Sequence, residues 1–432
     1  MDERSVPTRR GNPLSSLRFR DNRVFWLGTS CSSIGQAAFL VASSWLAFRL
    51  GGSGAVGLVT FATMIPLFLA TLVGGVLADR RERRSLVLAA EAAQGAIAVV
   101  IAVQALRGAM PLAALVALVF LAGVARAIEM PTVQTVLPSL VPRDELLNIF
   151  SLNNLASRGS RFVGPALVAP ILGLGGRHAG ALAYLVIAAL YLLALLQVLR
   201  VPTMRQTHRT TLNVRQQVVE GVRYLGAHSV LGLLLGVVIL HCLLTMSFDS
   251  TLPLFASQNL HGSGAIYSSM VSAMGLGSIA AALLLAGMHS PRRRGALLFI
   301  GGVGSGFATG LMAIAMNNLL ALGAIFLVGV TTTWFMTLAN TMMQEAVPDR
   351  LRGRVSGIYL MSASGVMSFG NLGAGYLAAR YGSAPVLGWP ALLFVVLLLV
   401  ISGVRPALRR LYRAGTFATE RTGSAAPLTL AD

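Results

Sequence analysis

The fold is decided by a pattern that is clearest in residues 56–84, which read VGLVTFATMIPLFLATLVGGVLADRRERR. The first 23 residues of this stretch carry no charge, and the last six are DRRERR. An α-helix rises about 1.5 Å per residue, so an apolar block of this length covers a hydrocarbon core of about 30 Å. The stretch therefore predicts a transmembrane helix that ends in a charged loop.

The same alternation of apolar blocks and polar loops continues along all 432 residues. The chain is 55% hydrophobic and only 11% charged, whereas soluble domains carry about 25% charged residues. The bilayer is therefore the predicted solvent. Apolar windows predict an all-α membrane protein with twelve transmembrane helices near residues 24–48, 56–78, 85–106, 111–135, 147–174, 179–199, 229–256, 263–288, 296–316, 318–342, 354–379 and 385–404.

The formal net charge of +19 comes entirely from arginine, because none of the 34 basic residues is a lysine. Of these arginines, 27 fall in the two chain ends and in alternate loops. Cytoplasmic loops retain such an excess. The pattern predicts a multi-pass protein of the cell inner membrane with both termini in the cytoplasm, and it argues against nucleic acid as a partner.

The two halves of the chain repeat each other. A shift of 206 residues lays Val141-Pro142-Arg143-Asp144 over Val347-Pro348-Asp349-Arg350. This predicts two six-helix bundles related by parallel duplication, a design in which the substrate path lies between the halves. The expected parts are a cytoplasmic N-tail (1–23), an N-terminal bundle (24–199), a cytoplasmic linker (200–228), a C-terminal bundle (229–404) and a cytoplasmic C-tail (405–432). Valines at helical spacing predict an amphipathic helix within the linker.

The loop after the second predicted helix reads Gly75-Val76-Leu77-Ala78-Asp79-Arg80-Arg81-Glu82-Arg83-Arg84. It resembles the loop signature of the major facilitator superfamily, Gly-x-x-x-Asp-Arg-x-Gly-Arg-Arg, with Glu82 in place of the second glycine. This loop and residues 347–355 resemble the branch that contains the enterobactin exporter and related drug and macrolide effluxers. The resemblance implies a secondary transporter that works by alternating access.

The resemblance also implies a gating role for this loop. The carboxylate of Asp79 is expected to latch onto the start of the eleventh helix, whose exposed amides attract negative charge. The alternative is a solvated loop that only sets the topology. The candidate gating residues are Gly75, Asp79, Arg80, Arg83, Arg84, Arg352, Gly353 and Arg354.

The fifth predicted helix contains Ser160-Arg161-Phe162-Val163-Gly164-Pro165. This segment resembles an antiporter motif, Gly-x-x-x-Gly-Pro-x-x-Gly-Gly, of which only the Gly164-Pro165 core is retained. A proline removes one backbone hydrogen bond and bends a helix. The same two residues therefore have a purely structural explanation as a helix bend.

A few charged side chains fall inside the predicted helices, where a charge at mid-bilayer costs about 2.5 to 3.5 kcal/mol. Such residues face a cavity or a partner. The spacing allows Arg126 and Glu129 to pair, and it leaves open whether the group forms a structural network or contacts substrate and protons. Asp249 is either a proton-linked site or a structural residue, which caps a helix break before Pro253 or pairs permanently with a neighbouring arginine. The candidates are Glu91, Arg126, Glu129, Arg158, Arg161 and Asp249.

No enzyme signature is present, no cofactor is predicted, and the only cysteines, Cys31 and Cys242, do not indicate a metal site. Without lysine the chain cannot form a P-loop. The leading hypothesis is proton-coupled antiport that exports a small amphiphilic molecule, such as a drug or a siderophore-like metabolite. The expected partners are this substrate, protons and the lipid bilayer, with the protein as a monomer. The alternatives are an uptake symporter and a transport-inactive membrane sensor.

Overall fold

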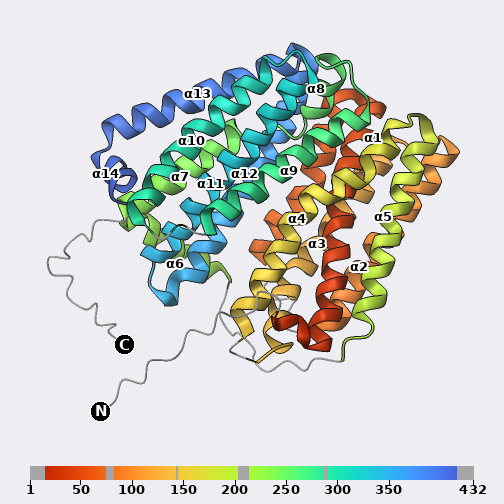
Figure 1. Ribbon diagram of the computed structural model, residues 1–432, viewed down its shortest axis with the longest axis horizontal. Coiled ribbons are helices and arrows are strands. Elements are labelled where there is room, and N and C mark those ends of the chain that lie inside the picture. Colours follow the sequence, from red (N-terminus) through yellow and green to blue (C-terminus); the bar gives the residue numbers. More distant parts are fainter. Residues whose placement is uncertain are drawn as a thin grey trace.

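The computed structural model describes residues 15–73, 82–142, 145–202, 214–286, 288 and 290–415, and within these ranges the chain is helical with no β-strand (Figure 1). Short 3-10 turns at Ser15–Arg18 and Leu137–Ser139 precede α1 and follow α3. The α-helices are α1 (Arg20–Val73), α2 (Arg83–Arg107), α3 (Leu112–Val136), α4 (Leu146–Gly173), α5 (Gly176–Val198), α6 (Val214–Ala227), α7 (Ser229–Leu244), α8 (Leu252–Gln258), α9 (Gly264–Ala286), α10 (Pro291–Ala313), α11 (Asn318–Ala346), α12 (Asp349–Tyr381), α13 (Ser383–Val404) and α14 (Pro406–Ala414).

Most of these helices are apolar enough to lie in a membrane. Within the described ranges, eight are long and apolar enough to cross it, or nine if α6 and α7, bent by 110°, form one span. In a bilayer the chain must satisfy its backbone hydrogen bonds internally, and helices do so within each segment. The all-helical membrane fold expected from the sequence is therefore present.

The first helix, α1, is interrupted by two glycines. Gly51 has φ −161° and ψ 26°, and Gly52 has φ +67°, a left-handed conformation that favours glycine. A straight helix of the 54 residues of α1 would be about 80 Å long. The turn at Gly51–Gly52 separates the two segments that the sequence predicts at 24–48 and 56–78. Residues 74–78 of the second prediction lie outside the described ranges.

The seventh predicted helix, 229–256, is wrong in one respect, because it breaks between α7 and α8. Hydroxyl groups compete for its carbonyls: Thr245 Oγ1 donates to His241 O at 2.7 Å, and Ser247 Oγ donates to Cys242 O at 2.8 Å. Pro253 has no N–H with which to continue the ladder. Asn371 of α12 supports the broken segment, since its Oδ1 accepts from the Ser250 N–H at 3.1 Å.

The amphipathic helix predicted in the linker is present as α6. Its Leu225 is buried, while Val219 and Val222 are 57% and 53% exposed. Gly221 packs on Ile358 of α12, and Glu220 forms an ion pair with Arg354 of the same helix. The described part of the linker is therefore docked on α12.

Two groups of helices meet at one end of the molecule (Figure 1). Figure 1 shows α1–α5 and α7–α13 close together at the end that carries α8, and further apart at the end that carries α6. We call these the α8 end and the α6 end. The main contacts between the groups are α1 with α12 and α4 with α9.

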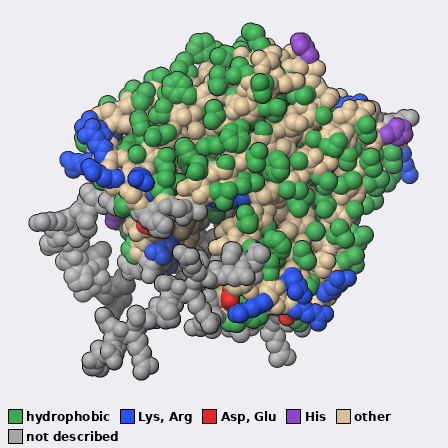
Figure 2. Space-filling view, viewed as in Figure 1, with side chains coloured by type: hydrophobic (Ala, Val, Ile, Leu, Met, Phe, Trp, Pro, Cys, Tyr) green, Lys and Arg blue, Asp and Glu red, His purple; other side chains and the backbone are tan. Residues whose placement is uncertain are grey.

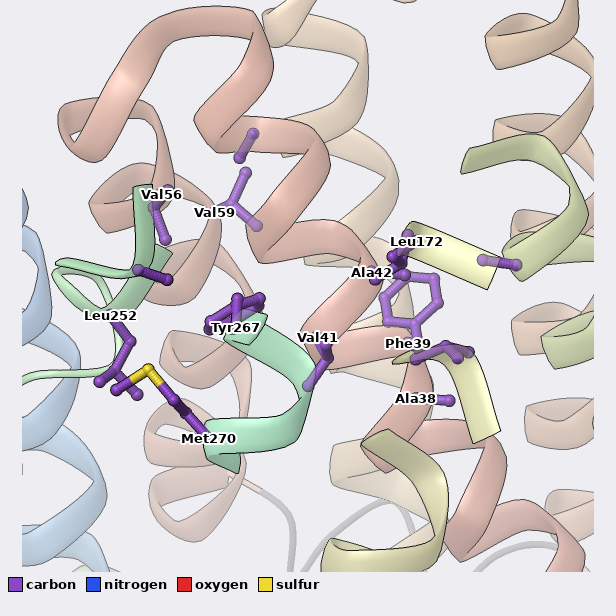
Figure 3. Close-up of a cluster of buried hydrophobic side chains, with 14 of the residues drawn as sticks. Ala38, Phe39, Val41, Ala42, Val56, Val59, Leu172, Leu252, Tyr267 and Met270 are labelled. Carbon is purple, nitrogen blue, oxygen red and sulfur yellow. The ribbon is translucent and has the colours of Figure 1, made fainter. Parts of the chain in front are cut away.

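The buried hydrophobic side chains follow the same division. One cluster joins both groups around α8, and Figure 3 shows part of it, with Phe39 of α1, Leu252 of α8, and Tyr267 and Met270 of α9. Two further clusters each belong to one group. One lies around Phe25 in the first group and the other around Phe335 in the second.

Glycines let the two groups touch through their backbones. A Cβ on Gly57 of α1 would lie 3.0 Å from Asn371 O of α12, and one on Gly375 of α12 would lie 2.6 Å from Ser53 O. In the other contact, a Cβ on Gly275 of α9 would lie 2.6 Å from Arg161 O of α4. Small residues allow such close approach between membrane helices, where hydrophobicity provides no driving force.

We expect Gly275→Ala to lower the thermal stability of the purified protein, because the new methyl group overlaps the α4 backbone and overpacking costs about 1 to 3 kcal/mol. The matched control is Gly310→Ala, since a Cβ there meets nothing within 4 Å. The measurement is thermal unfolding in detergent. Equal unfolding temperatures for the two variants would show that the α4–α9 contact is not tight.

Candidate transport pathway

A network of polar side chains lies buried inside the first group of helices, centred on the carboxylate of Glu129. Glu129 Oε1 receives Arg126 Nη1 and Ser32 Oγ, each at 3.1 Å, and Oε2 receives Gln94 Nε2 at 2.8 Å. Tyr191 completes the network by donating from its hydroxyl to Gln94 Oε1 at 3.1 Å. The Glu129 carboxylate thus joins α1, α2 and α3 directly, and Gln94 extends the network to α5.

The sequence positions this network through helical spacing. Arg126 and Glu129 are three residues apart on α3 and therefore share a face. Their side chains are 22% and 2% exposed, so the ion pair lies in the interior and not on the surface. Breaking such a buried pair leaves an uncompensated charge, which costs about 3 to 5 kcal/mol.

Glu91 lies beside this network but has no donor of its own. It is 1% exposed, and neither of its oxygens has a hydrogen-bond partner among the described residues. The Ser32 hydroxyl lies near both carboxylates and donates to Glu129. An isolated buried carboxylate is costly, so Glu91 is the group in this network that most needs a proton or a counter-ion.

The α4 helix carries a polar stripe. Asn154, Ser157 and Arg161 are exposed, and Arg158 is half-buried. These residues recur at helical spacing along one side of the helix. Charged side chains in membrane segments face a cavity or a partner and not the lipid, so this stripe is the side of α4 that is expected to face away from lipid.

Asp249 lies in the break between α7 and α8 and is partly exposed. It is near enough to Arg161 of α4 for their charges to interact, and the hydroxyl of Tyr267 of α9 lies in the same region. The charges of an acidic residue of the second group and a basic residue of the first therefore interact, although the two side chains form no ion pair within 4.0 Å among the described residues.

Gly164 and Pro165 do not interrupt α4, which remains one helix from Leu146 to Gly173. A Cβ on Gly164 would lie 2.7 Å from both Ala37 Cβ and Ile34 O of α1. Gly164 therefore allows close packing of α4 on α1.

Part of the candidate gating loop can be located. Gly75, Asp79 and Arg80 lie outside the described residues. Arg83 Nη1 donates to Thr135 O at 3.1 Å, near the end of α3, and Arg84 Nη2 donates to Leu199 O at 2.7 Å, after α5.

The partner segment of this loop is described at the start of α12. Arg352 Nε donates to Gln344 O at 3.1 Å near the end of α11, and Arg354 pairs with Glu220 of α6. Gly353 faces open space. Three of these arginines, Arg83, Arg84 and Arg352, thus bind carbonyls near helix ends, where positive groups are favoured, whereas Arg354 pairs with a carboxylate.

His241 is a buried polar residue that sequence reasoning missed. Its Nε2 lies 2.9 Å from Ser305 Oγ of α10, and its ring packs between Phe335 and Phe394. Ser32, Gln94 and Tyr191 were missed as well. All four are uncharged or weakly charged residues inside apolar blocks, so no composition signal marks them.

This arrangement of helices matches solved transporter structures. The nucleoside transporter NupG matches 89% of this chain and 98% of its own with a TM-score of 0.70 at 13% identity. The peptide transporter POT in complex with sulfate covers 91% of this chain and 96% of its own with a TM-score of 0.70 at 12% identity. These similarities establish the fold.

The model of one family, described as transmembrane secretion effector, matches residues 11–417. The chain belongs to this family of major facilitator transporters. This transporter is similar to the enterobactin exporter EntS of Shigella boydii serotype 4 (strain Sb227), with 27% identity over 372 residues, or 85% of each chain. EntS of Escherichia coli O139:H28 (strain E24377A / ETEC) is 28% identical over 352 residues, 80% of this chain and 83% of its own.

The family settles the class of protein. The chain is a multi-pass membrane transporter and not an enzyme, as the sequence predicts. The major facilitator resemblance is confirmed over nearly the whole chain.

We expect Arg126→Gln to destabilise the transporter by about 3 kcal/mol, because Glu129 is left buried without its counter-ion. Arg158→Gln is the matched control, since the charged neighbour of Arg158 is another arginine, Arg161. It is expected to leave stability unchanged or raise it. Thermal unfolding of both variants tests this, and an unfolding temperature for Arg126→Gln equal to that of the wild type would mean that the pair contributes nothing.

Proposed function

We propose that this transporter exports small amphiphilic molecules of siderophore or drug type across the cell inner membrane by proton-coupled antiport. The match to a secretion family along residues 11–417 supports export as the direction of transport. The similarity to enterobactin exporters from two enteric bacteria supports a siderophore-like substrate and an inner-membrane location. Because one chain contains both helix groups, the proposed functional unit is a monomer with its substrate path between the groups.

The proposed topology has twelve crossings. The break at Gly51–Gly52 divides α1 into two, and α7 with α8 forms one broken crossing. Single crossings are α2, α3, α4, α5, α9, α10, α11, α12 and α13. The two groups then correspond to the duplicated six-helix halves of 24–199 and 229–404, joined by the linker 200–228.

The proposed orientation places the α6 end in the cytoplasm, with the N-tail (1–23) and the C-tail (405–432). Described arginines at the starts and ends of helices support it. The α6 end has the larger number, which includes Arg20, Arg23, Arg83, Arg84, Arg200, Arg223, Arg352 and Arg354, whereas the α8 end has Arg49, Arg107, Arg177 and Arg380. The shared core at the α8 end then closes the outer side, and the path opens toward the cytoplasm, where an exporter binds its substrate.

Arg161 and Arg158 are the proposed contacts for anionic groups of the substrate. Both lie on the polar stripe of α4, and Arg161 is exposed. A positive side chain in a low-dielectric path attracts negative ligands strongly. This favours catecholate or carboxylate substrates over cations.

Asp249 is the proposed proton-coupling group. It belongs to the second group of helices and its charge interacts with that of Arg161 in the first, so its surroundings would change if the groups moved against each other. Glu91 and Glu129 are surrounded by helices of the first group alone, which would move together. A coupling site needs a group whose proton affinity differs between the two transport states.

The gating loop completes the proposal. Asp79 is proposed to hold the first group against the start of α12 when the α6 end is closed. Arg354 is already bound to Glu220 of α6, which places the linker helix at the same position. The loop with Gly75 and Arg80, and the segment with Gly353, would then act together in each transport cycle.

The test of function is accumulation of a catecholate siderophore, with enterobactin as the probe, in everted membrane vesicles from cells that express the transporter. Export predicts uptake into everted vesicles when the lumen is acidified, and none into vesicles without the protein. Accumulation only in right-side-out vesicles would favour the uptake symporter. The absence of transport of enterobactin and of a panel of amphiphilic drugs would favour the sensor.

We expect Asp249→Asn to abolish accumulation driven by a pH gradient while exchange of substrate down its own gradient persists. The asparagine keeps the volume and removes the titratable carboxyl group. Glu91→Gln is the matched control and should retain gradient-driven accumulation. The reverse result, with coupling retained in Asp249→Asn and lost in Glu91→Gln, would move the coupling site to the network around Glu129.

A further inference from the structure

The last described helix, α14, is amphipathic and lies across the ends of its neighbours. The backbone turns at Arg405, which has extended φ and ψ of −103° and 96°, and α14 begins at Pro406. In Figure 1 α14 is seen nearly end-on while α13 runs across the view. The helix therefore leaves the direction of α13 directly after the membrane span ends at Val404.

One face of α14 is fixed to the protein. Leu408, Leu411 and Tyr412 are buried, and the ring of Tyr412 lies 5.1 Å from that of Phe299 of α10. A Cβ on Gly295 of α10 would lie 2.6 Å from Leu411 O, so the two helices touch through their backbones. The apolar face of α14 is consequently packed against the protein and does not contact the lipid.

The other face of α14 consists of arginines. Arg405, Arg409, Arg410 and Arg413 are all exposed. Arg409 and Arg413 are four residues apart, and Arg410 and Arg413 are three apart, spacings at which like charges destabilise a helix. The folded chain thus maintains a cluster that repels itself.

The start of α10 extends this cluster. Arg292 and Arg293 are exposed, and a Cβ on Gly415, which ends α14, would lie 3.0 Å from the Arg292 nitrogen. In this part of the described chain, Arg294 pairs with Glu345. The remaining arginines of α14 and of the start of α10 have no carboxylate within ion-pair distance among the described residues. They are Arg292, Arg293, Arg405, Arg409, Arg410 and Arg413. Figure 2 shows arginine side chains gathered on the side of the molecule that carries α14.

We propose that this basic face binds the phosphate headgroups of anionic phospholipids. It consists of Arg292, Arg293, Arg405, Arg409, Arg410 and Arg413, and we call it the α14 arginine face. Its position favours lipid over an acidic protein: α13 is an apolar span that ends at Val404, and α10 is another that begins at Pro291. The face therefore lies at the depth of the headgroups, and guanidinium groups bind phosphate oxygens in a bidentate manner.

Clusters of four to eight basic residues next to a membrane span attract anionic lipid. Each basic residue raises the affinity for the lipid by a factor of about five. The inference depends on α14 lying at a membrane surface and holds for either orientation of the chain. It is therefore independent of the direction and coupling of transport.

The test uses the full-length purified protein, loaded with an equimolar mixture of phosphatidylglycerol and phosphatidylcholine, with bound lipid counted by native mass spectrometry. The wild type should retain phosphatidylglycerol in excess. The triple variant Arg409→Gln, Arg410→Gln, Arg413→Gln should lose this preference at least tenfold. The corresponding triple Arg→Lys variant keeps the charge and should retain most of the preference for phosphatidylglycerol.

A matched control removes three exposed arginines elsewhere, through Arg20→Gln, Arg23→Gln and Arg223→Gln, and should leave the preference close to wild type. An equal loss in this control would mean that net charge, and not the α14 arginine face, selects the lipid. A wild type without preference for phosphatidylglycerol would overturn the proposal and favour an acidic protein as the partner. Thermal unfolding of each variant confirms that the protein is folded.

Discussion

The close backbone contact between two groups of helices is the constraint on which the rest of the structure depends. Gly57 and Gly375 allow α1 to touch α12, and Gly275 allows α9 to touch α4. Around these contacts the two groups share a single hydrophobic core, while toward the α6 end each group has its own. A molecule built in this way is joined at one end and divided at the other, as one state of a rocking transporter requires.

Two sets of charged side chains differ in where they lie relative to the contact between the two helix groups. Inside the first group, Glu129 accepts three hydrogen bonds that join α1, α2 and α3, and Gln94 extends the network to Tyr191 of α5. Between the groups, Arg161 and Asp249 are close without a described hydrogen bond between them, so their interaction is free to change. The first set stabilises one bundle, whereas the proposed role of the second is to respond when the two bundles move against each other.

Much of the fold follows from the sequence, because in a bilayer the length of an apolar block fixes the length of a helix. Spacing also gives the pairing of Arg126 with Glu129. The break after Leu244 does not follow, since it depends on Thr245 and Ser247 hydroxyls that bind nearby carbonyls and on the amide of Asn371 from a distant helix. For the same reason the sequence does not indicate the roles of Gln94 and Tyr191, because the hydrogen-bond partners of these neutral polar residues lie on other helices. Asp79 lies outside the described residues, and its latch stays a prediction.

The most direct test of alternating motion about the shared core is a pair of distance measurements by electron paramagnetic resonance on doubly spin-labelled transporter in nanodiscs. After removal of Cys31 and Cys242, one pair of labels would be placed at Leu174 and His261 at the α8 end, and another at Gln134 and Thr341 toward the α6 end, all exposed positions. Addition of substrate under a change of pH should lengthen the first distance while it shortens the second. Distances that stay constant, or that change in the same direction, would contradict the account.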